Sequence, residues 1–188
     1  MHEDGLYENI DFSEKELFNE EYVKCSFVNC NFSKSNLRST DFIDCVFTGC
    51  NFSLAVLNNT GIKDVKFFSC KLMGVNFSVC NNFLFSVIFR DCHLDYSSFF
   101  QKRMQKTSFT NCSLKEVDFE EADLSKAIFD NCNMEQARFI KTNLEKADFR
   151  SAQQYSFDPA VNKIKRAKFT YPGVLGLLLR YDIDVEFE

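Results

Sequence analysis

The chain has 188 residues, which suits a single domain, and its formal net charge is −5. Phenylalanine is abundant at 23 residues, tryptophan is absent, and there are only 2 prolines and 6 glycines. We expect no membrane span, because no apolar run reaches about 18 residues. The acidic start lacks the basic and apolar regions of a signal peptide, so we expect a cytoplasmic protein.

The first 21 residues are polar and strongly acidic, with eight acidic residues and one basic residue. A large residue recurs every five positions at Tyr7, Phe12 and Leu17, but its surroundings are irregular. We expect residues 1–21 to form an N-terminal cap with weak first repeats.

From Tyr22 to Arg150 the five-residue recurrence is firm, and we call the large residue of each unit its centre residue. A small residue stands two positions before most centre residues. Helices repeat every 3.6 residues and strands every 2, so neither explains the pattern. A short fixed period predicts a solenoid whose units each point one large and one small side chain inward.

A longer period of four units shows how the units stack. Four five-residue units per coil place every fourth centre residue in one column, and we expect one aromatic and one cysteine column to form a core ladder. Its members are Phe27, Phe47, Phe67, Phe89, Phe109, Phe129, Phe149, Cys30, Cys50, Cys70, Cys92, Cys112 and Cys132. All nine cysteines follow the repeat and not the paired spacing of a metal site, so we interpret them as small buried residues.

The pattern breaks once. After Phe77 the next centre residue should be residue 82, which is asparagine, and the pattern resumes at Leu84 and Phe89. The sequence therefore predicts a two-residue insertion within 78–83 that bulges from one face without changing the columns.

Two groups of residues in the next coils are candidate contact sites for a partner. Lys102 falls on a small inward position, where a buried ammonium is costly. We expect the backbone to bulge and turn Lys102 outward beside Arg103; a locally open coil is the alternative. The second group is the most acidic local stretch, at Glu116, Asp118, Glu120, Glu121 and Asp123.

The last segment, 151–188, is predicted to hold two last repeats, a helix that begins at Pro172, and a strand over 182–188. Its apolar side chains either cover the last coil only or also form a homodimer, which we favour. The dimer candidates are Leu175, Leu178, Leu179, Ile183, Val185 and Phe187.

Units such as Cys30-Asn31-Phe32-Ser33-Lys34 and Ala122-Asp123-Leu124-Ser125-Lys126 resemble those of the pentapeptide-repeat family, across residues 7–169. The resemblance implies an all-β protein, a right-handed quadrilateral parallel β-helix, here of about seven coils. Within that family, the sequence most resembles the bacterial quinolone-resistance proteins of the Qnr, MfpA and microcin-immunity type.

That type of protein implies a non-enzymatic rod that dimerises end to end and binds DNA gyrase or topoisomerase IV as a DNA mimic. We therefore expect no cofactor, no metal, no direct contact with nucleic acid and no membrane contact. Only two histidines are present, His2 and His93, and no Ser/His/Asp or Cys/His constellation can be assembled around an inward cysteine. Residues 22–150 carry a net charge of +2, which departs from an acidic rod, so a scaffold protein with an unknown partner is the alternative.

Overall fold

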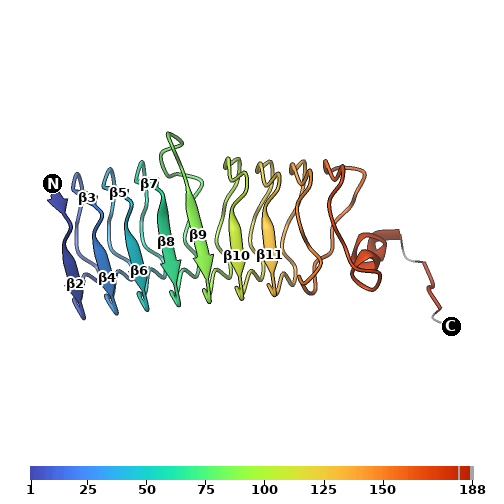
Figure 1. The fold of residues 1–188 in the computed structure, drawn as a ribbon, viewed down its shortest axis with the longest axis horizontal. Coiled ribbons are helices and arrows are strands. Elements are labelled where there is room, and N and C mark those ends of the chain that lie inside the picture. The colour runs from blue at the N-terminus through green and yellow to red at the C-terminus, as the bar shows by residue number, and fades with distance from the viewer. Residues whose placement is uncertain (182, 187–188) are drawn as a thin grey trace.

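The computed structural model describes residues 1–181 and 183–186, and the chain winds there into a rod of stacked coils (Figure 1). Four five-residue units make one coil, and the units give the rod four faces. We number the faces in chain order: face 1 begins at His2, face 2 at Tyr7, face 3 at Phe12 and face 4 at Leu17. No helix in this part of the chain is long and apolar enough to cross a membrane.

Two parallel sheets lie on adjoining faces. The sheet on face 1 contains β1 (His2–Glu3), β3 (Glu21–Val23), β5 (Asp41–Ile43) and β7 (Gly61–Lys63). The sheet on face 2 contains β2 (Leu6–Glu8), β4 (Ser26–Val28), β6 (Val46–Thr48), β8 (Val65–Phe68), β9 (Val87–Arg90), β10 (Ser108–Thr110) and β11 (Ile128–Asp130). The first strands lie within 1–21, so this segment has the conformation of a coil.

The register of these strands sets the coil length. Phe27 pairs with Phe47, which lies four units later, and isolated parallel bridges such as Asn31 to Asn51 repeat that spacing on the faces without strands. The seven strands of face 2 span about six turns, slightly fewer than the seven expected, and isolated bridges continue the stacking to Lys168. The predicted class, an all-β parallel solenoid, is confirmed.

Each corner between faces depends on one residue with positive φ, which usually lies two positions after the centre residue. Lys34 at φ 55° and Asn111 at φ 52° are examples. This left-handed conformation turns the chain through the corner, and it favours asparagine and glycine over other residues.

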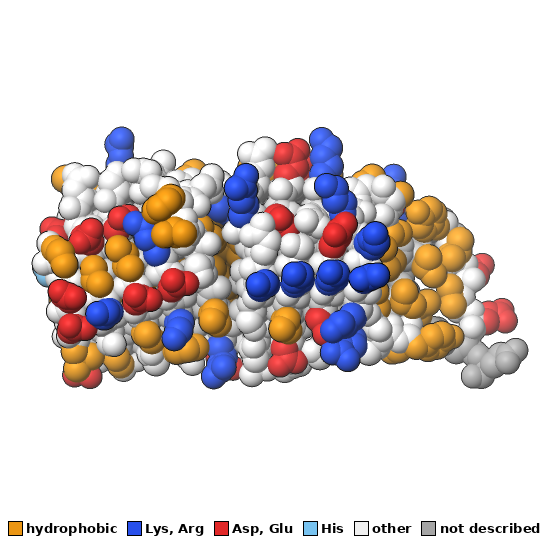
Figure 2. Space-filling model, turned by 45° about the horizontal axis from the view of Figure 1, so that its top comes forward, with side chains coloured by type: hydrophobic (Ala, Val, Ile, Leu, Met, Phe, Trp, Pro, Cys, Tyr) orange, Lys and Arg blue, Asp and Glu red, His pale blue; other side chains and the backbone are white. Residues whose placement is uncertain are grey.

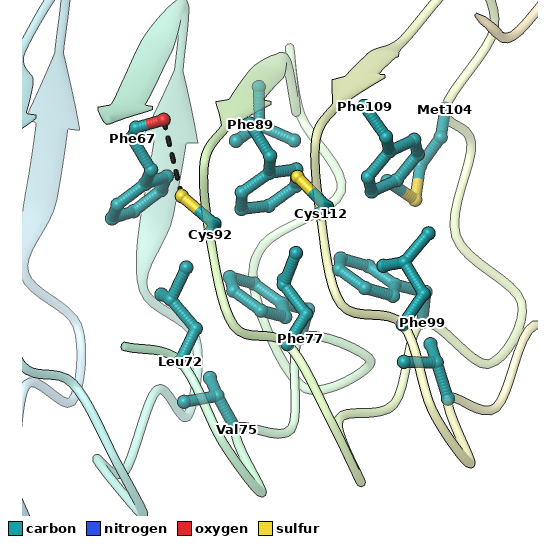
Figure 3. Close-up of a cluster of buried hydrophobic side chains, with 14 of the residues drawn as sticks. Phe67, Leu72, Val75, Phe77, Phe89, Cys92, Phe99, Met104, Phe109 and Cys112 are labelled. Carbon is teal, nitrogen blue, oxygen red and sulfur yellow. Dashed lines mark hydrogen bonds between the residues drawn. The ribbon is translucent and has the colours of Figure 1, made fainter. Parts of the chain in front are cut away.

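The rod interior consists of stacked rings and thiols (Figure 3). The aromatic column of face 2 stacks nearly parallel, with ring centroids 4.7 Å apart between Phe27 and Phe47 and 5.3 Å apart between Phe89 and Phe109. All thirteen residues of the predicted core ladder are at most 3% exposed. In the cysteine column, most thiols donate to a backbone carbonyl of the preceding coil, as Cys92 does to Phe67.

The insertion lies slightly later than the predicted segment 78–83. The amide of Asn81 still donates to the carbonyl of Thr60, but Val65 pairs with Val87 and not with Phe85, which lies four units after Val65. The extra residues therefore lie between Asn81 and Val87, in a loop that projects from face 1 (Figure 1). The expectation that Leu84 resumes the core is wrong, because this side chain is 65% exposed; Phe85 packs against the core instead.

The C-terminal segment differs from the prediction in two ways. Pro172 precedes two short 3-10 helices, η1 (Gly173–Leu177) and η2 (Leu179–Tyr181), instead of a longer helix. Residues 183–186 form no strand, because an alternating segment needs a neighbouring strand for its backbone hydrogen bonds and has none among the described residues. The remaining residues of the predicted strand, Asp182, Phe187 and Glu188, lie outside the described residues.

Candidate interaction surfaces

The nine thiols do not form a reactive site. All nine are free and buried, and burial raises the pKa of Cys45 to about 11 and that of Cys80 to about 12. Cys45 and Cys80 are therefore poor nucleophiles and poor metal ligands, and burial keeps the other seven thiols away from solvent. Within residues 1–181 and 183–186, no group of three or more His, Cys, Asp or Glu side chains is arranged to hold a metal.

Lys102 lies inside the rod, so the expectation that it turns outward is wrong. The residue is 1% exposed, and its ammonium donates to the backbone carbonyl of Cys80 and, at 2.7 Å, to Oδ1 of Asn82. Nζ also lies 4.9 Å from the centroid of the Phe85 ring. The backbone does bulge near this column, but it does so one coil earlier, and the lysine fills the space that the loop leaves.

The side chain of Lys102 is long enough to serve two purposes. Its methylene groups are buried inside the rod, and its ammonium donates hydrogen bonds to polar groups at the base of the loop. Among the described residues, no carboxylate is a hydrogen-bond partner of Lys102, and burial lowers the pKa of its ammonium. Arg103 is exposed as expected, so the structure separates these two predicted contact residues.

The five acidic candidates follow one coil around three faces and do not gather on one. Asp118 bridges to Arg138 on face 4, and Asp123 bridges to Asn143 on face 1. Two of the five already have basic partners from the next coil: Arg138 lies 2.6 Å from Glu120, and Lys141 lies 3.6 Å from Glu121.

The other acidic candidates differ in how far they are engaged. Asp123 accepts hydrogen bonds from the side chains of Gln105 and Asn143. Glu116 is exposed and forms no ion pair within the described residues. Basic residues of the next coil therefore neutralise two of the five acidic candidates.

The C-terminal end of the rod gathers the apolar candidates. Five of the six line a small apolar hollow of about 160 Å³, namely Leu175, Leu178, Leu179, Ile183 and Val185. Phe187 lies outside the described residues. Leu177 turns toward the last coil and is buried, whereas Leu179 is 69% exposed. The segment thus covers the rod with one side and leaves apolar side chains on the other.

A row of basic residues on the corner between faces 1 and 2 was missed from the sequence. Lys106, Lys126, Lys146 and Arg166 each lie two positions after a centre residue and four units apart, and all four are exposed. Figure 2 shows basic side chains in a line along this side, toward the C-terminal end of the rod. The same four-unit spacing that revealed the core ladder would have found the row, had it been applied to outward positions.

Comparisons with known proteins agree with this architecture. A family model described as a pentapeptide repeat region matches residues 21–99 and 102–171. A search of the curated proteins found no match.

Solved structures to which the chain aligns include a trypsin-treated variant of QnrB1, described as a plasmid-mediated fluoroquinolone resistance protein. It is 21% identical, with a TM-score of 0.49, and the alignment covers 99% of this chain and 91% of that one. Full-length QnrB1 is 20% identical, with a TM-score of 0.41 and coverage of 95% and 100%. HetL, a pentapeptide repeat protein of heterocyst differentiation regulation from the cyanobacterium Nostoc, is 12% identical, with a TM-score of 0.43 and coverage of 88% and 85%.

Proposed function

Because the chain belongs to the pentapeptide-repeat family, we propose that it acts without catalysis, as a rod that binds another protein. The observation that supports this proposal is the separation of inward and outward side chains in each five-residue unit. Two side chains of each regular unit build the core, and the others form long, regular outer faces. Stacked repeats with such faces are well suited to binding a macromolecule.

We propose further that two copies join through the C-terminal ends. The apolar hollow lined by Leu175, Leu178 and Leu179 supports this, because an exposed apolar group at the end of a rod is suited to self-association. In a dimer, residues 183–186 could gain the strand partner that they lack among the described residues. A homodimer would roughly double the length of the rod.

Sedimentation of a Leu179→Asp variant tests the dimer. The matched control is Leu54→Asp, since Leu54 is also exposed, at 59%, but lies on the side of the rod. We expect the wild type and Leu54→Asp to sediment as dimers and Leu179→Asp as a monomer. A monomeric wild type, or a dimeric Leu179→Asp, would contradict the proposal.

The partner we propose to test first is a type II topoisomerase, either DNA gyrase or topoisomerase IV. The rod would engage it as a DNA mimic and so protect it from quinolones or toxins in the cytoplasm of a bacterium. The resemblance of the repeat units supports this partner, as does the acidic N-terminal coil, where residues 1–21 carry a net charge of −7. Nine free thiols are in keeping with a reducing compartment.

A supercoiling assay with purified gyrase, with and without ciprofloxacin, tests this partner. We expect the protein to inhibit supercoiling at high concentration or to restore it in the presence of the drug. Neither effect, together with no binding to either topoisomerase, would exclude the mimic.

A scaffold that binds a different protein is the second candidate. It is favoured by the ion pairs that Glu120 and Glu121 form with Arg138 and Lys141, because a mimic of DNA needs carboxylates that are free to meet basic residues of the enzyme.

A further inference from the structure

The corner between faces 1 and 2 changes the sign of its charge along the rod. Its turn residues before the loop are Asp4, Lys24, Asp44 and Asp64, and those after the loop are Lys106, Lys126, Lys146 and Arg166. All eight are exposed and have positive φ. Leu84, which has positive φ in the loop, separates the two series. The second series, which we call the basic row, therefore has one sign over four successive coils.

The basic row lacks acidic partners within the described residues. None of its four members forms an ion pair there. Asp148, the nearest carboxylate on face 2, already lies 2.8 Å from Arg150 and 3.5 Å from Lys168. The surrounding outward positions add further positive charge: the bases here are Arg103, Lys106, Lys126, Lys146, Lys163, Lys165, Arg166 and Lys168, and the acids are Asp123, Glu145 and Asp148.

The row is also unfavourable for the fold itself. Successive coils are about 4.8 Å apart, so like charges are stacked closely and repel one another. A left-handed turn is better suited to asparagine or glycine than to lysine. Asparagine does occupy the equivalent corner between faces 2 and 3, at Asn9, Asn29, Asn111 and Asn131. Stability alone therefore does not explain four cations at this corner.

The surface beside the row is hollowed and partly apolar. Lys126, Lys146 and Arg166 border an open hollow of about 430 Å³ that Ile128, Lys168 and the already paired Asp148 also line. Where the row meets the loop, Phe83 is 67% exposed and Leu84 is 65% exposed. A ligand that lies along the row thus meets cations over most of its length and apolar side chains at one end.

We propose that the basic row binds a short acidic segment of a partner protein, whose apolar end residue packs against Phe83 and Leu84. The length of the row supports this choice. Four coils span roughly 14 Å, which matches four or five residues of an extended peptide. A nucleic acid fits less well, because a long polyanion would continue past the loop to Asp44 and Asp64 and toward the acidic N-terminal coil.

The inference rests on the proposed function as an interaction rod, but not on a topoisomerase as the partner. It also differs from mimicry of DNA, since it assigns binding to the cations of the surface. A peptide-binding experiment separates the two, because it can succeed whatever the supercoiling assay shows, and it can fail while the supercoiling assay succeeds.

The test uses the full chain and a fluorescent peptide of about six glutamates that ends in leucine, with anisotropy measured at low and physiological salt. The variant is Lys126→Glu combined with Lys146→Glu. The control is Lys24→Glu, which reverses a lysine of the same corner, with the same left-handed backbone, among the acidic residues. Circular dichroism checks that each variant is folded.

We expect the double variant to bind the peptide at least about tenfold more weakly, and Lys24→Glu to bind it within about twofold of the wild type. Phe83→Ser should weaken binding of the leucine-ended peptide but not of an all-glutamate peptide. Equal binding by the wild type and the double variant would overturn the proposal. So would tighter binding of a thymidine oligonucleotide with the same number of charges, or charge-dependent self-association of the protein without peptide binding.

Discussion

The buried ammonium of Lys102 allows a prediction that separates space filling from charge. Lys102→Ala removes three methylene groups, each worth about 0.8 kcal/mol, and leaves a cavity behind the loop. It also leaves the carbonyl of Cys80 without its donor. We expect the free energy of unfolding to fall by about 3 kcal/mol or more.

Lys102→Met keeps most of the volume and removes the charge. The loss of the hydrogen bonds to Cys80 and Asn82 is opposed by the relief of burying an ammonium that has no carboxylate partner. The amide of Asn82 is exposed and can turn to water. We expect this variant to lie within about 1 kcal/mol of the wild type at neutral pH.

The difference in the free energy of unfolding between the wild type and Lys102→Met should change with pH in a definite direction. Burial lowers the pKa of Lys102 below its usual 10.5, so the unfolded chain holds this proton more tightly than the folded one. The cost of the buried charge is fully present below the folded pKa and is relieved as the pH rises toward 10.5. The wild type should therefore gain stability relative to Lys102→Met through this alkaline range.

Denaturant unfolding, followed by circular dichroism at several pH values, measures all three proteins. The difference between the wild type and Lys102→Met cancels the titration of the other groups, which both proteins share. If Lys102→Met is as unstable as Lys102→Ala, the hydrogen bonds and not the packing hold the loop. If the difference in the free energy of unfolding between the wild type and Lys102→Met stays constant as the pH rises through the alkaline range, the ammonium is not desolvated as we argue.

Three further predictions concern the core and the surface. Phe109→Ala should lower the free energy of unfolding by about 3–5 kcal/mol and Phe109→Leu by less than half as much; equal losses in denaturant titrations would refute ring packing as the cause. The native thiols, with the pKa of Cys45 raised to about 11 and that of Cys80 to about 12, should resist alkylation at pH 8 until denaturant is added, and rapid labelling of the folded protein would contradict their burial. Hydrogen bonds from Arg150 lower the pKa of Asp148 from 3.8 to about 2, so the stabilisation that ionised Asp148 gives the fold is present above pH 3.8 and is lost as the pH falls through 2. Over this pH range, the free energy of unfolding of Asp148→Asn should fall less than that of the wild type. An identical fall in the two proteins would exclude this contribution of Asp148.

The sequence predicts the regular part of this fold well, because the regular part is local. A unit of five residues can be recognised without knowing what it touches, and the four-unit spacing of Cys30, Cys50 and Cys70 carries the coil length directly. The burial of the thiols follows, since every cysteine shares the phase of the small inward residue.

The irregular part of the fold depends on contacts between residues that the spacing of the repeat does not reveal. Counting residues reveals an insertion, but not which residues leave the core, so the spacing places Leu84 inside and overlooks Phe85. The ammonium of Lys102 is satisfied by a backbone carbonyl, which no residue type signals. Residues 183–186 alternate as a strand does, yet a strand also requires a neighbour, and the sequence of one chain does not specify one.

The surface was harder to predict than the core for a related reason. Inward positions admit few residue types, so a column of phenylalanine is conspicuous, whereas outward positions admit almost any type. Glu120 and Glu121 are adjacent in sequence and suggest an acidic patch, but their neighbours in space are Arg138 and Lys141 of the next coil. The basic row becomes visible only when outward residues are also compared four units apart.

Successive coils pair in a fixed register of four units, as Phe27 pairs with Phe47. The length of the rod can therefore change without changing the orientation of its faces. Removing one complete coil, for example residues 107–126, would shorten the rod by about 4.8 Å and leave every remaining face in line. Removing a single five-residue unit would instead turn the C-terminal end by a quarter of a revolution relative to the loop on face 1. Gain or loss of whole coils can therefore change how far apart two binding partners are held, and gain or loss of single units can change the angle between them.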